Sequence, residues 1–145
     1  MEKIREMNVL DLRQVIEIEK KCFEDCWSID AFVYEIMVNK NSYYYVYERD
    51  NDILAFIGSR LFKNHIHITN LAVDPKDQNK GIATKLIKYI ISMAKNKKKK
   101  NVCLEVRYSN KKAIDLYEKL GFKITKKLLD YYKHEDGIEM VLNVK

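Results

Sequence analysis

A carboxylate in a predicted central strand is the first group that could do acid–base chemistry. The apolar residues of segment 102–106 alternate, which leaves Glu105 on the other face of the strand with Cys103 and Arg107. A carboxylate placed there can accept a proton directly or through a water molecule. A structural Glu105 paired with Arg107 is the alternative, because buried carboxylates are normally paired.

Two residues of the next predicted segment carry groups that could join the same chemistry. Tyr117 lies on the apolar stripe of a predicted helix, where its residue type favours a core aromatic whose hydroxyl finds a partner. Asn110 opens that helix, and an amide side chain in this position caps the free N–H groups of the first turn. On residue types alone, both have a structural explanation.

The loop from Gln78 to Gly81 leads into an apolar helix and offers a site for an anion. Gly81 and Ala83 are small residues at the helix entry, where unpaired N–H groups and the helix dipole favour negative charge. A pyrophosphate fits such a site, and Lys80 adds a positive charge. The alternative is that Gly81 only eases a tight loop.

The cysteines and histidines do not predict a metal centre. Cys22, Cys26 and Cys103 include no CxxC pair, so we expect reduced, mostly buried thiols. The Cys103 thiol is a candidate nucleophile by residue type, but the sequence places no histidine beside it. His65 and His67 share one face of a predicted strand without a third ligand, which favours a partly exposed structural role.

Changes in hydrophobic period divide the chain into strands and helices that must position these groups. Alternating and aromatic segments predict strands, and apolar residues at helical spacing predict helices, with Asn8 and Ser28 as caps and Gly121 closing the last helix. A turn is expected at His134–Gly137. The predicted strands cover 2–7, 43–47, 53–62, 65–73, 102–106, 122–132 and 138–144, and the predicted helices cover 8–23, 28–39, 82–94 and 109–120.

These elements predict a mixed α+β fold. The strand at 65–73, the helix at 82–94 and the strand at 102–106 form one right-handed parallel crossover, whereas the other connections are antiparallel. Helices pack on this mostly antiparallel sheet. The 145 residues match the usual size of one domain, so a single domain over 1–145 is expected.

Composition narrows the class of protein and its partners. A formal net charge of +6 favours acidic partners, such as a phosphate-bearing cofactor, RNA or an acidic protein surface. The lysine run 97–100 fits a solvated helix end, and steering of such a partner is the alternative. The sequence has no apolar run that could span a bilayer and no signal-peptide pattern, so we expect a cytoplasmic protein without a membrane partner.

Four successive segments resemble the GNAT superfamily of N-acetyltransferases. They are Asn70–Pro75, Gln78–Ala83, Leu104–Arg107 with Ser109–Asn110, and Ala113–Phe122. Within that superfamily the chain is similar to the RimI-type N-terminal protein acetyltransferases, whose LEVRxSNxxAIxLYExLGF segment is reproduced from Leu104 to Phe122. The resemblance extends over nearly the whole chain and implies a GNAT-like acyl-CoA N-acyltransferase fold.

The resemblance implies acetyl-CoA as the cofactor. Glu105 is then the general base, and Tyr117 is the general acid that protonates the departing thiolate of coenzyme A. Backbone groups of Leu71, Ala72 and Val73 would meet the pantetheine and the acetyl carbonyl, and Asn110 would add a contact. The residues implied to hold the pyrophosphate are Asn79, Lys80, Gly81, Ile82, Ala83 and Thr84.

The resemblance also implies a peptide groove with two walls. Tyr131 and Tyr132 form one wall, and their hydroxyls would hold the substrate backbone. Since they are adjacent in an extended segment, we expect their side chains to point to opposite sides. The family pattern has a proline before the tryptophan where this chain has Cys26, so the preferred N-terminal residue is not carried over. The opposite wall comprises Phe23, Glu24, Asp25 and Trp27.

These residues predict acetyl transfer to the N-terminal α-amino group of a protein or peptide by direct attack in a ternary complex. An α-amino group is roughly 10% neutral at pH 7 and a lysine only about 0.04%, which favours N-terminal substrates. One alternative is a small amine or a lysine side chain as acceptor. Another is a catalytically silent module that binds acyl-CoA or RNA. Nucleic acid is not expected as a substrate, a ribosomal protein near the ribosome is compatible with the prediction, and a monomer or weak homodimer is expected.

Overall fold

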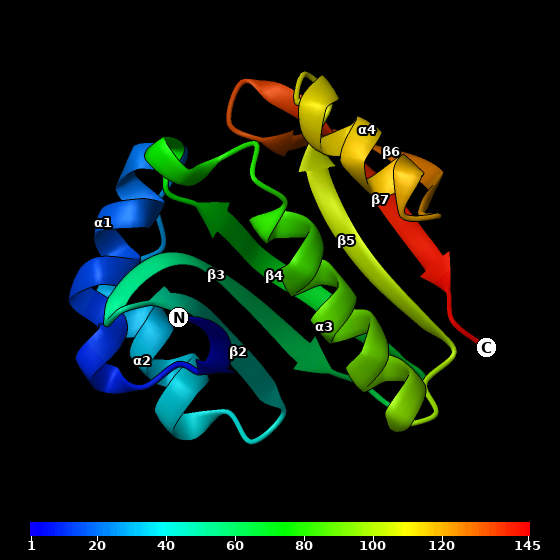
Figure 1. The fold of residues 1–145 in the computed structure, drawn as a ribbon. Coiled ribbons are helices and arrows are strands. Elements are labelled where there is room, and N and C mark those ends of the chain that lie inside the picture. Colours follow the sequence, from blue (N-terminus) through cyan, green and yellow to red (C-terminus); the bar gives the residue numbers. More distant parts are fainter.

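A computed structural model describes residues 1–145, and all seven strands belong to one sheet (Figure 1). The strand order is β1-β2-β3-β4-β5-β7-β6, and only β4 and β5 run parallel. This confirms the predicted mixed α+β fold with one parallel crossover. The prediction of a single domain stays a prediction. The strands are β1 Glu2–Glu6, β2 Ser42–Arg49, β3 Asp52–Leu61, β4 His65–Val73, β5 Asn101–Arg107, β6 Lys123–Tyr132 and β7 Glu135–Asn143.

Helices cover both faces of the sheet and bury two apolar clusters. The larger cluster joins α3 and α4 to one face, and the smaller joins α1 and α2 to the other. Each helix contributes an apolar stripe that would otherwise meet water, so this burial holds the helices on the sheet. The helical segments are a 3₁₀ turn at Val9–Asp11, α1 Leu12–Cys22, α2 Ile29–Val33, a π turn at Tyr34–Val38, a 3₁₀ turn at Pro75–Asp77, α3 Ile82–Asn96 and α4 Lys111–Lys119.

The predicted caps explain where these helices begin and end. The Asn8 side chain accepts from the backbone N–H of Leu10 in a capping box with Asp11, and Ser28 accepts from the N–H of Ala31. Gly121 follows α4 with φ +100°, the left-handed conformation that glycine adopts at little cost. No helix has the length and apolar character needed to cross a membrane.

The last hairpin differs from its prediction. The expected turn at 134–137 is wrong, because β7 begins at Glu135 and pairs it with Tyr132. Only residues 133 and 134 form the loop, and His134 has a positive φ of 70°. The acidic residues of the expected turn therefore lie on the strand.

Candidate active site

A cleft opens where β4 and β5 diverge. Their parallel pairing ends at His67 and Cys103, so the later residues of the two strands face each other across an opening. Figure 1 shows the strands separating toward the end of the sheet where α3 and α4 begin. The cleft has a volume of about 1150 Å³, which is large enough for an extended cofactor and part of a second substrate.

Most of the predicted site residues lie along this cleft. Two do not: Lys80, whose ammonium lies 3.7 Å from the Asp77 carboxylate, and Tyr131. The structure brings together residues from six separated segments of the chain. Those that line the cleft are Phe23, Glu24, Asp25, Trp27, Leu71, Ala72, Val73, Asn79, Gly81, Ile82, Ala83, Thr84, Glu105, Asn110, Tyr117 and Tyr132.

The start of α3 has the properties of an anion site. The backbone N–H groups of residues 79–84 donate to no acceptor in the protein, since the first helical bond runs from Lys85 to Gly81. Gly81 has φ +82°, and nothing lies within 4 Å of the position that a Cβ would take. Unpaired N–H groups and the positive end of a helix dipole attract phosphate oxygens. These residues therefore fit the pyrophosphate of acetyl-CoA.

The cleft side of β4 provides backbone groups beyond the last pair with β5. Leu71, Ala72 and Val73 still pair with β3 on their other side, which holds this segment straight. The carbonyl of Val73 accepts from Gln78 Nε2 at 3.0 Å, and the Cys22 thiol lies 3.3 Å from the same oxygen. The free edge of β4 can thus pair with amide groups of a pantetheine chain.

Glu105 is hydrogen-bonded to a residue that the sequence analysis did not place beside it. Its Oε1 lies 2.7 Å from His67 Nε2 and 3.5 Å from the Tyr131 hydroxyl. The proposed alternative pairing with Arg107 is wrong, because that guanidinium binds Glu135 at 3.1 Å and Asp25 at 3.4 Å. Glu105 is consequently not paired with an arginine or a lysine.

Tyr117 and Asn110 face the cleft from α4. The Tyr117 side chain is 8% exposed, and burial raises the pKa of its hydroxyl to about 12. The group therefore keeps its proton at neutral pH and can donate it. The Asn110 side chain accepts from the N–H of Ala113 at 3.2 Å, which confirms the predicted cap and leaves its amide N–H groups toward the cleft open to a ligand.

The two tyrosines at the end of β6 do not point to opposite sides. Their ring centroids lie 4.9 Å apart, and both rings pack against Gly137. That prediction is wrong because Asp130 has φ +51° and the pairing register shifts between Leu128 and Tyr132. Such a bulge breaks the alternation of side chains and turns both rings toward β5.

The connection between α1 and α2 forms the facing wall and is tied across the groove. Asp25 reaches Arg107, whose guanidinium stacks on the Tyr132 ring with its carbon 4.7 Å from the centroid. Trp27 is held by its backbone N–H, which donates to the buried Glu19 carboxylate at 2.8 Å. The sequence analysis missed Glu19, although its position four residues after Val15 lies on the buried face of α1.

The three cysteines are free, but the expectation that most are buried is wrong. Cys22 lines the cleft, Cys103 lies on the open face of β5, and Cys26 is exposed in the loop between α1 and α2. Burial and the charge of Glu105 raise the pKa of Cys103 to about 12. A thiol with so high a pKa is a poor nucleophile, although the structure places His67 opposite Cys103, where the sequence predicted no histidine.

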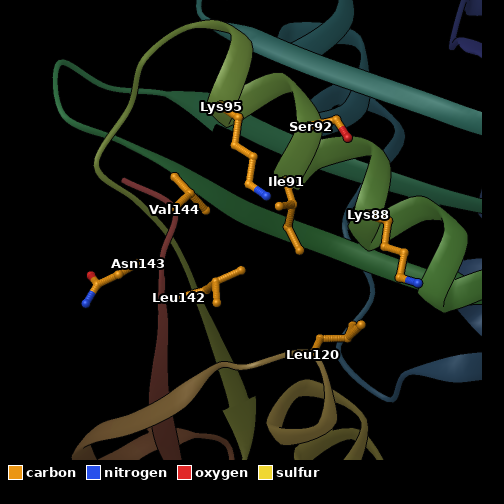
Figure 2. Close-up of a pocket in the computed structure, with 8 residues that line it drawn as sticks. All are labelled: Lys88, Ile91, Ser92, Lys95, Leu120, Leu142, Asn143 and Val144. Atoms are coloured by element: carbon orange, nitrogen blue, oxygen red, sulfur yellow. The ribbon is translucent and has the colours of Figure 1, made fainter.

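A second, smaller pocket lies apart from the predicted site residues (Figure 2). It has a volume of about 370 Å³ and is lined by α3 and by residues at the end of β7, with Lys88 and Lys95 as its only charged side chains. It contains no carboxylate, imidazole or thiol for acid–base or nucleophilic chemistry. The predicted acid–base residues Glu105 and Tyr117 line the larger cleft instead.

Comparisons with known proteins agree with this geometry. Residues 12–122 match the model of the acetyltransferase (GNAT) family. Ribosomal protein bS18-alanine N-acetyltransferase of Escherichia coli (strain K12) is 29% identical over 141 residues, which cover 96% of this chain and 93% of that protein. N-alpha-acetyltransferase 30 of Schizosaccharomyces pombe is 30% identical over 129 residues, which cover 83% of each chain.

Comparison with solved structures gives the same result as comparison of the sequences. The crystal structure of the Escherichia coli ribosomal-protein-S18-alanine N-acetyltransferase superposes with a TM-score of 0.92 at 28% identity, over 100% of this chain and 95% of that one. Arabidopsis thaliana NAA60, solved in complex with acetyl-CoA, shares the fold with a TM-score of 0.88 at 18% identity, over 99% of this chain and 98% of that one. The chain therefore belongs to the acetyltransferase (GNAT) family and is an acetyl-CoA-dependent N-acetyltransferase.

Proposed function

We propose that this enzyme acetylates the N-terminal α-amino group of a protein, with a ribosomal protein as one suitable class of substrate. The observation that carries the proposal is the groove beside Glu105, bounded by Tyr132 on one side and by the α1–α2 connection on the other, with the Tyr131 hydroxyl 3.5 Å from the Glu105 carboxylate at its margin. The names of the bS18-alanine and N-alpha-acetyltransferase relatives support an α-amino acceptor.

The proposed division of the cleft assigns each part a role. The free N–H groups of residues 79–84 hold the pyrophosphate, and the edge of β4 at 71–73 holds the pantetheine. The bound acetyl-CoA supplies an acetyl thioester. The groove between the two walls then leads the substrate N-terminus toward Glu105, so that the amine and the thioester meet where the strands diverge.

Two side chains of this enzyme move protons in the proposed reaction. Glu105 accepts a proton from the substrate ammonium and releases the neutral amine that can attack. Tyr117 donates its proton to the departing thiolate, and it is suited to this because it remains protonated at neutral pH. No side chain is required to form a covalent bond with the acetyl group.

Removing the two hydroxyls of the groove tests the peptide acceptor. We expect the Tyr131→Phe, Tyr132→Phe double variant to lose roughly one to two orders of magnitude in kcat/KM with a peptide, because each lost hydrogen bond contributes about 0.5 to 1.5 kcal/mol. A polyamine presents no backbone to hold and should lose less. Mass spectrometry of both products, with exposed Tyr34→Phe as the matched control, gives the comparison. Equal losses for peptide and polyamine would favour the small-amine acceptor instead.

Tyr117→Phe should lower kcat by about tenfold, a smaller loss than the one expected when the proposed base Glu105 is replaced. The reason is that a thiol with a pKa near 8.5 leaves tolerably well without a proton donor at neutral pH. The loss should shrink as pH rises, since a free thiolate needs the donor less. Stopped-time assays from pH 6.5 to 9 check this, and an unchanged kcat at every pH would return Tyr117 to a packing role.

The cellular setting follows from the same substrate class. A ribosomal protein as substrate supports a cytoplasmic enzyme near the ribosome, and we propose a monomer or a weak homodimer. A peptide library varied at its first two positions, with lysine and polyamine controls, identifies the acceptor directly. Acetylation restricted to lysine side chains or polyamines would overturn the proposal.

A further inference from the structure

One hydrogen bond at the base of the cleft has no role in the chemistry described so far. His67 Nε2 lies 2.7 Å from Glu105 Oε1, and the two residues come from the two strands that diverge to form the cleft. His67 of β4 lies opposite Cys103 of β5 in the last parallel pair, and Glu105 follows Cys103 by two residues. Residues two apart in a strand share a face, so the imidazole and the Glu105 carboxylate lie on the same face of the sheet. The contact is therefore built into the strand register.

The other side of the imidazole is open. His67 makes no second hydrogen bond to the protein, and 23% of its side chain is exposed, compared with 17% for Glu105. Nδ1 is therefore free to exchange a proton with water, while Nε2 contacts the carboxylate. The ring forms a bridge from Glu105 to solvent.

The reaction needs such a bridge because it releases a proton in every turnover. The nitrogen of an ammonium substrate loses two protons on becoming an amide. One goes to Glu105, and the other replaces the proton that Tyr117 gives to the thiolate of coenzyme A. The remaining proton is left on Glu105, which must lose it before the next substrate can react. A base bounded by bound substrates has little direct access to water.

We propose that His67 is the proton relay of Glu105, an inference that rests on the proposed role of Glu105 as the base. The O–H bond of the protonated Glu105 breaks as an N–H bond forms at His67 Nε2. The imidazolium then releases the proton from Nδ1 to water. His67 acts through Glu105 and is a positioning and relay residue that does not contact the acetyl group.

The other ionisable side chains on this face are engaged elsewhere. His65 stacks on Phe62 with ring centroids 4.8 Å apart, and Glu139 accepts from the Thr125 hydroxyl. The Tyr131 hydroxyl has a raised pKa, caused by burial and by the charge of Glu105, so it cannot accept the proton at neutral pH. His67 is therefore the side chain that approaches the carboxylate most closely, at 2.7 Å, and it has no other protein partner.

Rescue of a His67 variant by added imidazole tests whether His67 relays protons or has only a structural role. We expect His67→Ala and His67→Gln to lower kcat at least tenfold, while the acetyl-CoA affinity and the acceptor KM stay within a few-fold. Added imidazole should restore the rate of His67→Ala several-fold, because it can take the proton from Glu105 in the space left behind. The wild type and the neighbouring His65→Ala variant should not respond. If His67→Ala does not fold, the rate and its response to small buffers are measured with His67→Gln instead.

The same His67 substitution made in a Glu105→Gln enzyme tests separately whether His67 is the relay and whether Glu105 is the base. In a Glu105→Gln enzyme the His67 substitution should cost nothing further, since the relay works only through Glu105. The acceptor used is whichever amine the wild type acetylates. An unchanged kcat in His67→Gln, or a loss that imidazole does not repair, would overturn the relay. Equal losses from the His67 substitution in both backgrounds would instead reject Glu105 as the base.

Discussion

Replacing Glu105 by Gln is expected to lower kcat by about 10² to 10⁴, the usual contribution of a positioned general base. Glutamine has nearly the same shape and can still bind His67, but its amide oxygen does not take a proton at neutral pH. Acetyl-CoA affinity should stay within a few-fold, because the residues proposed to hold the pyrophosphate and the pantetheine lie at the start of α3 and on β4. The loss should therefore fall on turnover.

The cross-strand neighbour of Glu105 is the matched control for this substitution. Glu139 pairs with Glu105 in the β5–β7 register and lies on the same face of the sheet. Glu139→Gln removes the same charge nearby and should leave kcat within a few-fold of the wild type. Steady-state rates with saturating peptide, together with a direct measurement of acetyl-CoA binding, test both variants. A normal kcat for Glu105→Gln would leave Glu105 a structural carboxylate.

Local signals explain why so much of the fold was predictable. Asn8, Ser28 and Asn110 each cap the helix that follows, so the helix starts could be placed from single residues. The order of strand, helix and strand from His65 to Arg107 permits one handedness of crossover. Each of these features depends on neighbours in sequence, which a pattern of residues records directly.

The groups that complete the site depend on contacts between distant segments. His67 meets Glu105 because the register of β4 and β5 sets His67 beside Cys103, and no residue pattern fixes the register of two strands separated by a helix. The tyrosine pair was misplaced for a related reason. A positive φ at Asp130 shifts the register of β6, and a non-glycine residue gives no warning of it.

Substituting Thr84 by Glu should weaken acetyl-CoA binding by roughly 10² or more. Thr84 is the third residue of α3 and lines the cleft among the free N–H groups of 79–84. A carboxylate there occupies the donors that a pyrophosphate needs and repels its charge. At an effective dielectric constant of about 20, two unit charges about 5 Å apart repel by roughly 3 kcal/mol, and a tenfold loss in affinity needs only about 1.4 kcal/mol.

The same substitution should not destabilise the protein, and this separates binding from folding. An acidic side chain in the first turn of a helix interacts favourably with its dipole, typically by about 0.3 to 1 kcal/mol. Thr84→Gln has a similar size without the charge and should bind acetyl-CoA within a few-fold of the wild type. Isothermal titration with acetyl-CoA and thermal unfolding without ligand measure the two quantities. Equal affinities for the Glu and Gln variants would show that the phosphates lie elsewhere, because a carboxylate at this helix start cannot share its N–H groups with a pyrophosphate.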